Sequence, residues 1–120
     1  ITIFKQLRWK RGGGHNLYKN KYIGCCMAFN KEILKKALPF PNNLPMHDWW
    51  IGLIGELFGT VKFIEEPLLL YRRHGANVSS TSEGSKYSIV KKINMRRIIA
   101  YEVLKRFLAY KFKRNDKVRL

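Results

Sequence analysis

The segment His47-Asp48-Trp49-Trp50 offers the clearest chemistry, because it follows a proline-rich loop and opens an expected helix. A carboxylate at a helix start is held by backbone N–H groups and stays ionised. Asp48 is therefore a candidate general base that takes a proton from an attacking hydroxyl. Trp49 or Trp50 would then form a platform for the apolar face of a sugar. A structural interpretation is also open, in which Asp48 caps the helix and both tryptophans pack in the core.

A second cluster, Tyr71-Arg72-Arg73-His74-Gly75, stands between an expected strand and a polar loop. Proteins of the α/β class often place ligand contacts where a strand ends. Two arginines and a histidine suit a diphosphate, or a divalent ion that bridges one. The alternative is a solvated basic strand end without a ligand.

The cysteines and aspartates limit which chemistries this chain can hold. Cys25 and Cys26 are adjacent and are the only two cysteines, so neither a disulfide framework nor metal-ligand spacing is present. We predict that they are small apolar residues of a strand in a reducing compartment. The only aspartates are Asp48 and Asp116, so no Asp-x-Asp motif occurs.

The net charge of this 120-residue chain is +16, and it is unevenly distributed. Residues 1–21 and 86–120 are strongly basic, whereas residues 24–74 are nearly neutral. This pattern favours chemistry in the middle of the chain and electrostatic docking at its ends. The alternative is a basic nucleic-acid-binding module, which the charge supports, although no specific nucleic-acid motif is visible.

Periodicity predicts a small number of elements around these candidate residues. The longest apolar runs fall well short of the ~20 residues that a transmembrane helix needs. Asn30 is a good N-cap for a helix that ends at Pro39. Short apolar or alternating runs indicate strands. The expected strands are Tyr22–Phe29, Thr60–Glu65 and Leu68–Arg72, and the expected later helices are about Asp48 to Phe58 and about Ser88 to Phe112.

The last expected helix combines an apolar face with a dense basic surface. We predict that its apolar face packs on the core as far as Leu104. Beyond that point we predict that aromatic and apolar side chains rest on an anionic membrane. The apolar face consists of Ile89, Val90, Ile93, Ala100, Leu104, Phe107 and Leu108, and the predicted membrane set is Phe107, Leu108, Tyr110 and Phe112.

Five motifs occur in an order that resembles one enzyme family. They are Gly24-Cys25-Cys26-Met27-Ala28-Phe29, Leu38-Pro39-Phe40-Pro41, Pro45-Met46-His47-Asp48-Trp49-Trp50, Phe58-Gly59, and the run from Glu66 to Val78. This series resembles the carboxyl-terminal half of family 2 glycosyltransferases with the GT-A fold. It is most similar to the bacterial rhamnosyltransferase-like members that build surface polysaccharides.

The resemblance implies inverting transfer of a sugar from a nucleotide-sugar donor to a saccharide or lipid-linked acceptor. Asp48 matches the catalytic base, and Gly24 matches a glycine-containing loop near the donor sugar. Arg72 and Arg73 would lie beside His74, which matches a late histidine that joins the metal or the diphosphate. The implied cofactor is a divalent cation, Mg²⁺ or Mn²⁺, bound mainly by a nucleotide-binding half that these residues do not include.

The resemblance also sets the expected fold and organisation. We predict an α/β class, with a partial GT-A-like fold in which a short mixed sheet packs with helices and ends in a long basic amphipathic helix. The expected parts are a basic segment 1–21, an acceptor and catalytic-base half 22–80, and a basic helix and tail 81–120. Such a segment of a longer enzyme is expected to be inactive alone and to self-associate. Its expected location is cytoplasmic, with peripheral attachment at the inner face of the plasma membrane.

Overall fold

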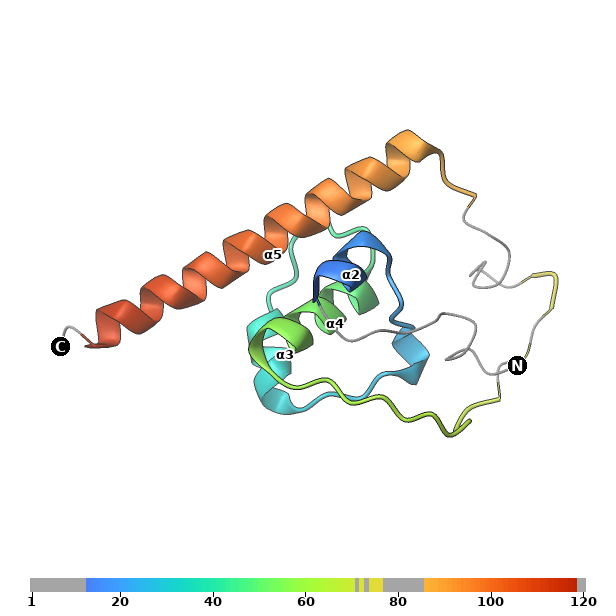
Figure 1. Cartoon of the computed structure of the whole chain (residues 1–120), viewed down its shortest axis with the longest axis horizontal. Helices are drawn as coiled ribbons and strands as arrows, with labels where there is room; N and C mark the ends of the chain where they lie inside the picture. Colours follow the sequence, from blue (N-terminus) through green and yellow to red (C-terminus); the bar gives the residue numbers. More distant parts are fainter. Residues whose placement is uncertain (1–12, 71, 73, 77–85, 119–120) are drawn as a thin grey trace.

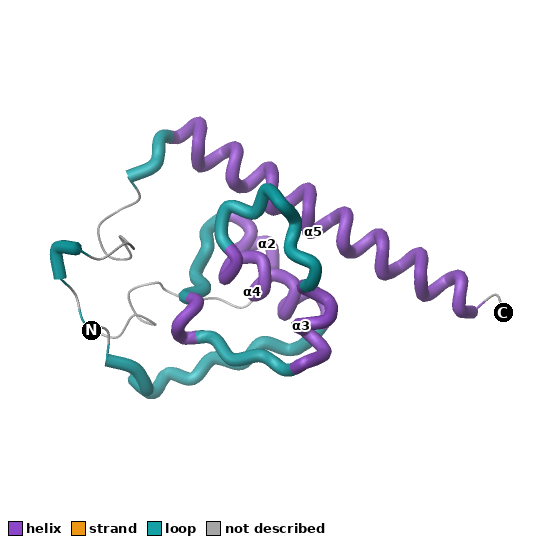
Figure 2. Tube along the Cα trace, turned by 180° about the vertical axis from the view of Figure 1, so that it is seen from behind, coloured by secondary structure: helices purple, strands orange, loops and turns teal. Residues whose placement is uncertain are grey.

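The computed structural model describes residues 13–70, 72, 74–76 and 86–118. Within these ranges the chain is helical and contains no strand (Figures 1 and 2). The predictions for Tyr71 and Arg73 lie outside the described residues. The elements are α2 (Gly13–Tyr18), the 3₁₀ turn η1 (Gly24–Cys26), α3 (Lys31–Ala37), α4 (His47–Phe58) and α5 (Ile89–Val118).

Helix α3 begins and ends where the sequence predicts. The side chain of Asn30 accepts a hydrogen bond from the Ile33 N–H at 3.0 Å, which satisfies one of the open donors of the first turn. The C-cap residue is Leu38, and Pro39 follows it, so the helix stops before the proline as expected.

Helix α4 supplies most of the core, and the other helices pack around it. Trp50 and Ile54 of α4 are fully buried, together with Ala37 of α3 and Ile99 of α5. The indole N–H of Trp50 donates to the Ala37 carbonyl at 2.9 Å, which ties α4 to the end of α3. Helix α5 runs along one side of this cluster and projects beyond it at both ends (Figure 1).

The predicted α/β fold with a mixed sheet is wrong for the part of the chain that the structure describes. In place of the first strand, Ile23 is extended and Gly24–Cys26 then forms a 3₁₀ turn. Tyr22, the first residue of that apolar run, is buried against Gly52 of α4. An apolar run forms a strand only where neighbouring strands complete its hydrogen bonds, and here the run meets a helix instead.

The two later predicted strands are also not formed in the described residues. Residues 60–70 contain neither helix nor ladder. Ile64, Leu68 and Leu70 expose most of their side chains, so this run is not a buried element. The apolar and alternating residues of this segment suggested two strands. Such a short pattern does not show whether a neighbouring strand is present to pair with it.

Helix α5 is confirmed as a long basic helix, and it continues past the predicted end to Val118. The predicted core-facing stripe is wrong, however. Ile99 is the buried residue of α5, with Met95 and Val103 packed against the same core, whereas Ile93 and Leu104 are exposed. The helix is therefore rotated relative to the prediction.

Arg106 explains this rotation. Its guanidinium lies over the Trp50 ring, 5.2 Å from the centroid. It also donates to the carbonyls of Lys36 at 2.6 Å, Leu38 at 2.9 Å and Pro39 at 2.6 Å. Because a planar guanidinium satisfies several carbonyls at once, this basic residue faces the core side of α5.

Two residues of the predicted membrane set pack on the rest of the protein instead. The Phe58 ring of α4 lies 5.0 Å from the Tyr110 ring and 6.5 Å from the Phe107 ring, measured between centroids. Lys36 also lies over the rings of Phe58 and Tyr110, at 5.6 Å and 5.8 Å from the centroids. Phe107 and Tyr110 therefore contact the rest of the protein, whereas Phe112 is exposed.

Candidate functional site

Asp48 is half-buried in the first turn of α4, and Met46 rather than Asp48 is the N-cap residue. Its Oδ1 accepts a hydrogen bond from the Trp49 N–H at 2.7 Å and from Asn20 Nδ2 at 3.3 Å. The same Asn20 accepts from the Tyr22 N–H at 2.9 Å through its Oδ1. These contacts fix one oxygen of the Asp48 carboxylate and connect it to the segment before η1.

The structure brings Gly24 and Asp48 together, although they are far apart in the sequence. A Cβ atom placed on Gly24 would lie 3.6 Å from Asp48 Cβ and 4.0 Å from Asp48 Oδ2. Among the described residues, Oδ2 accepts no hydrogen bond. One carboxylate oxygen is thus fixed, and the other lies beside a residue that has no side chain.

Trp49 and Trp50 are both buried, in agreement with the structural interpretation of these residues. The Trp49 indole N–H donates to the Asn16 carbonyl at 2.7 Å, and that of Trp50 donates to the Ala37 carbonyl. Their rings pack in the core, so this structure does not support the acceptor-platform prediction.

The described members of the second predicted cluster do not join the Asp48 site. Arg72 and His74 are exposed. Both views place the short segment 74–76 apart from the helix cluster (Figures 1 and 2). In the described part of the chain, no three His, Cys, Asp or Glu side chains come close enough to hold a metal ion. The implied divalent cation, whose ligands the resemblance places mainly outside these residues, therefore remains a prediction.

A polar cluster that the sequence reasoning missed lies between α2, Tyr22 and the end of α4. Glu56 Oε1 accepts hydrogen bonds from the Tyr22 hydroxyl and from Asn16 Nδ2. Burial, together with the hydrogen bond to Glu56 and its charge, raises the pKa of Tyr22 well above its ordinary value. The sequence feature that could have revealed this cluster is Glu56, the one charged residue in the apolar second half of α4.

Cys25 and Cys26 are exposed on η1, so the prediction that they are filler within a strand is wrong. Their Sγ atoms lie 3.8 Å apart. Partial burial, followed by the contact with Cys25, raises the pKa of the Cys26 thiol. A raised pKa disfavours the thiolate, which is the nucleophilic form, so Cys26 lacks the electrostatic mark of a catalytic cysteine.

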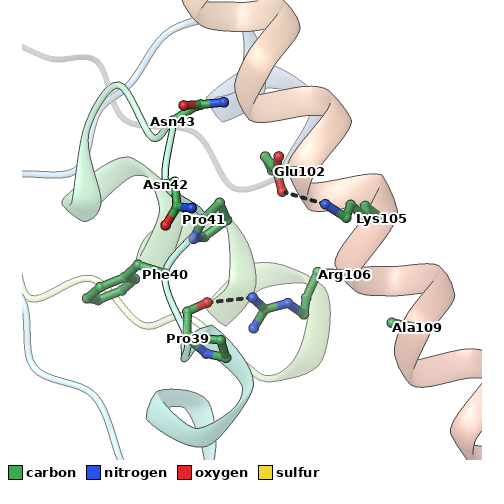
Figure 3. A pocket seen from close by; sticks show the side chains of 9 residues that line it. All are labelled: Pro39, Phe40, Pro41, Asn42, Asn43, Glu102, Lys105, Arg106 and Ala109. Atoms are coloured by element: carbon green, nitrogen blue, oxygen red, sulfur yellow. Dashed lines mark hydrogen bonds and ion pairs between the residues drawn. The ribbon is translucent and has the colours of Figure 1, made fainter.

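A groove of about 500 Å³ lies between the 39–43 loop and α5 (Figure 3). Pro39, Phe40 and Pro41 form one wall, and Arg106 on the α5 side donates to the Pro39 carbonyl. The acid of the groove, Glu102, pairs with Lys105 at 3.8 Å. Because its charged groups serve contacts within the protein, we assign no chemistry to the groove.

No family model, curated protein or solved structure matches this chain. Among the helices that the structure describes, none combines the length and apolar character needed to cross a membrane. The surroundings of Asp48 and the order of the sequence motifs are therefore the features that indicate a function.

Proposed function

We propose that this chain provides the catalytic-base part of an inverting glycosyltransferase with a nucleotide-sugar donor. The observation that carries the proposal is the Asp48 carboxylate, with Oδ1 fixed and Oδ2 open beside Gly24. The motif order supports the same reaction class. From that resemblance we take the acceptor to be a saccharide or a lipid-linked saccharide in bacterial surface polysaccharide synthesis.

In the proposed reaction, an acceptor hydroxyl loses its proton to Asp48 Oδ2 as its oxygen bonds to the anomeric carbon of the donor. The bond from that carbon to the diphosphate breaks, and nucleoside diphosphate leaves. The Trp49 N–H and Asn20 orient the base through Oδ1, which is the usual role of groups that support a general base. Gly24 leaves room for a substrate next to Oδ2.

The predicted diphosphate contacts remain predictions. The segment 74–76 lies apart from the helix cluster (Figures 1 and 2), so His74 reaches a leaving diphosphate only if this segment moves toward Asp48. The resemblance implies that a divalent cation, when bound, neutralises charge on that diphosphate, with ligands mainly from residues beyond this chain.

The net charge of +16 favours nucleic-acid binding as a second candidate. The exposed apolar side chains of α5 argue against it, because nucleic-acid interfaces are polar and strongly basic.

The test uses the full-length protein, with any sequence that flanks these 120 residues. Nucleoside diphosphate release is measured for a panel of nucleotide sugars, with and without oligosaccharide and lipid-linked acceptors, and with and without a chelator. We expect acceptor-dependent release that the chelator abolishes. Absence of release for every donor, together with tight salt-sensitive binding to DNA or RNA, would replace the proposal with the nucleic-acid alternative.

A further inference from the structure

Helix α5 exposes an apolar stripe on the side that faces away from the core. Ile89 is 75% exposed, Ile93 57%, Leu104 56% and Phe112 65%. With 3.6 residues per turn, these residues fall within an arc of about 140°, whose centre lies about 150° from the core-facing Ile99. We call this set the α5 stripe, and it consists of Ile89, Val90, Ile93, Tyr101, Leu104, Leu108 and Phe112.

Basic residues border the α5 stripe along its length. The helix contains ten Lys and Arg residues against two acids. On a helical wheel with 3.6 residues per turn, Arg114 lies at one border of the stripe and Lys105 near the other, with Lys91 about 60° beyond that border. Arg97 and Lys111 lie within the stripe. All five of these residues are exposed. Their long side chains can keep the charge in water while the stripe is covered.

We propose that α5 binds flat on the surface of an anionic lipid bilayer through the α5 stripe. An apolar stripe with a basic surround is the pattern of helices that lie in the membrane interface. Charge complementarity selects the lipid, because anionic headgroups attract the bordering Lys and Arg. The helix is about 45 Å long, so it presents a long contact parallel to the bilayer.

Two other occupants fit the α5 stripe less well. A second copy of this chain would bring a second set of the bordering Lys and Arg against the first, which costs electrostatic free energy. A nucleic acid would neutralise the charge but would leave the apolar side chains uncovered or pressed against phosphate. An anionic bilayer, with charged headgroups above an apolar interior, satisfies both features.

The proposal differs from the sequence prediction in its residues. Phe107 and Tyr110 pack near Phe58, so they do not belong to the docking surface. The contact instead extends to the first turns of α5, at Ile89 and Ile93. It does not depend on the proposed catalytic role of Asp48, and the two proposals fail separately.

The test is co-sedimentation of the full-length protein with vesicles. Neutral vesicles contain phosphatidylcholine alone, and anionic vesicles contain one-third phosphatidylglycerol. We expect binding to the anionic vesicles at low salt, weak binding to the neutral ones, and loss of binding at high salt. Equal binding to both vesicle types, or no binding to either, overturns the proposal.

One variant removes the apolar contacts through Ile93→Ser, Leu104→Ser and Phe112→Ser. Its matched control removes similarly exposed apolar side chains away from α5, through Ile64→Ser, Leu68→Ser and Leu70→Ser. We expect at least about tenfold weaker vesicle binding for the α5 variant and near-normal binding for the control. Equal behaviour of the two variants overturns the proposal.

A second pair of variants tests the charge of α5. It serves as an independent test in case the serine substitutions disturb folding. Lys91→Gln with Lys111→Gln removes two cations from α5, and Lys31→Gln with Lys62→Gln removes two exposed cations elsewhere. Both variants have the same net charge, so only position distinguishes them. We expect at least about tenfold weaker binding for the α5 pair alone. Circular dichroism checks that all variants keep their helix.

Sedimentation velocity without lipid separates the remaining occupants. If the wild type and the variant with serine substitutions in the α5 stripe both sediment as monomers, the proposal is supported. A wild-type dimer that the stripe substitutions dissociate overturns it in favour of a second copy, and an intact fold with no vesicle binding assigns the stripe to another protein segment.

Discussion

The two oxygens of the Asp48 carboxylate have different surroundings, and this difference is the main feature at the residue scale. Oδ1 is held by the Trp49 N–H and Asn20, while Oδ2 lies beside Gly24. The sequence identified the two residues separately, Asp48 from its place at the start of an expected helix and Gly24 from motif order. It did not identify Asn20, because a polar residue in a loop carries no pattern that points to a contact far along the chain.

Tyr22 predicts a specific dependence of stability on alkaline pH. Its pKa is raised in the folded state, so the unfolded protein loses this proton first as pH rises above about 10. Unfolding then releases a proton, and the contribution of Tyr22 to the free energy of unfolding is present below that pH and falls above it. Chemical unfolding from pH 8 to 11 should show a steeper decline for the wild type than for Tyr22→Phe, and parallel curves would contradict this.

Gly52 and Gly55 give a matched pair within α4. A Cβ at Gly52 would overlap the Tyr22 ring, whereas a Cβ at Gly55 would meet Val61 at an ordinary 3.6 Å. We expect Gly52→Ala to lower the free energy of unfolding by about 1–3 kcal/mol through overpacking. Gly55→Ala should leave it unchanged or raise it by up to about 1 kcal/mol through helix propensity. Urea denaturation measures both, and equal effects would argue against the Tyr22 packing.

At the scale of elements, the sequence predicted helices whose ends are marked by local signals. It did not predict structure that depends on contacts with distant parts of the chain. Asn30 and Pro39 mark the ends of α3 by their own chemistry, so that helix was predictable. The run from Tyr22 to Phe29 looked like a strand, because its composition does not reveal that Tyr22 meets Gly52 of a helix.

The rotation of α5 was unpredictable for a related reason. The helix has a wide apolar arc, and the preference for Ile99 over Ile93 at the core depends on contacts with other helices. Arg106 turns this side of α5 toward the core by donating hydrogen bonds to the carbonyls near the end of α3. Its charge had suggested that it lies on a solvated face.

Arg106 therefore gives a prediction about how α5 attaches to α3 and α4. Arg106→Lys keeps the charge but loses the planar fork that serves three carbonyls, so we expect a loss of about 2 kcal/mol in the free energy of unfolding. Arg97→Lys is the control, because Arg97 is exposed and bonds only to Asn94 in the described structure. We expect its effect to stay within about 0.5 kcal/mol. Thermal unfolding compares them, and a tolerated Arg106→Lys would refute the attachment.

At the scale of the whole molecule, a nearly neutral helical core carries one long basic helix along its side (Figure 1). The sequence itself contains this division of charge, while chemistry in the centre and docking at the ends stay predictions. The architecture of the centre was not predicted, because the resemblance implied a sheet that the described residues do not form. The expected self-association is untested, and the basic surface of α5 opposes it through that face.

The most direct test of the central claim compares Asp48→Asn with Asp116→Asn in the full-length protein. Both substitutions remove one carboxylate charge, and Asp116 is exposed near the end of α5. The measurement is kcat and the donor KM for nucleoside diphosphate release with the best donor from the panel. We predict that Asp48→Asn lowers kcat by at least ~100-fold with little change in donor KM, while Asp116→Asn matches the wild type. Near-normal turnover of Asp48→Asn would contradict the assignment of Asp48 as the base.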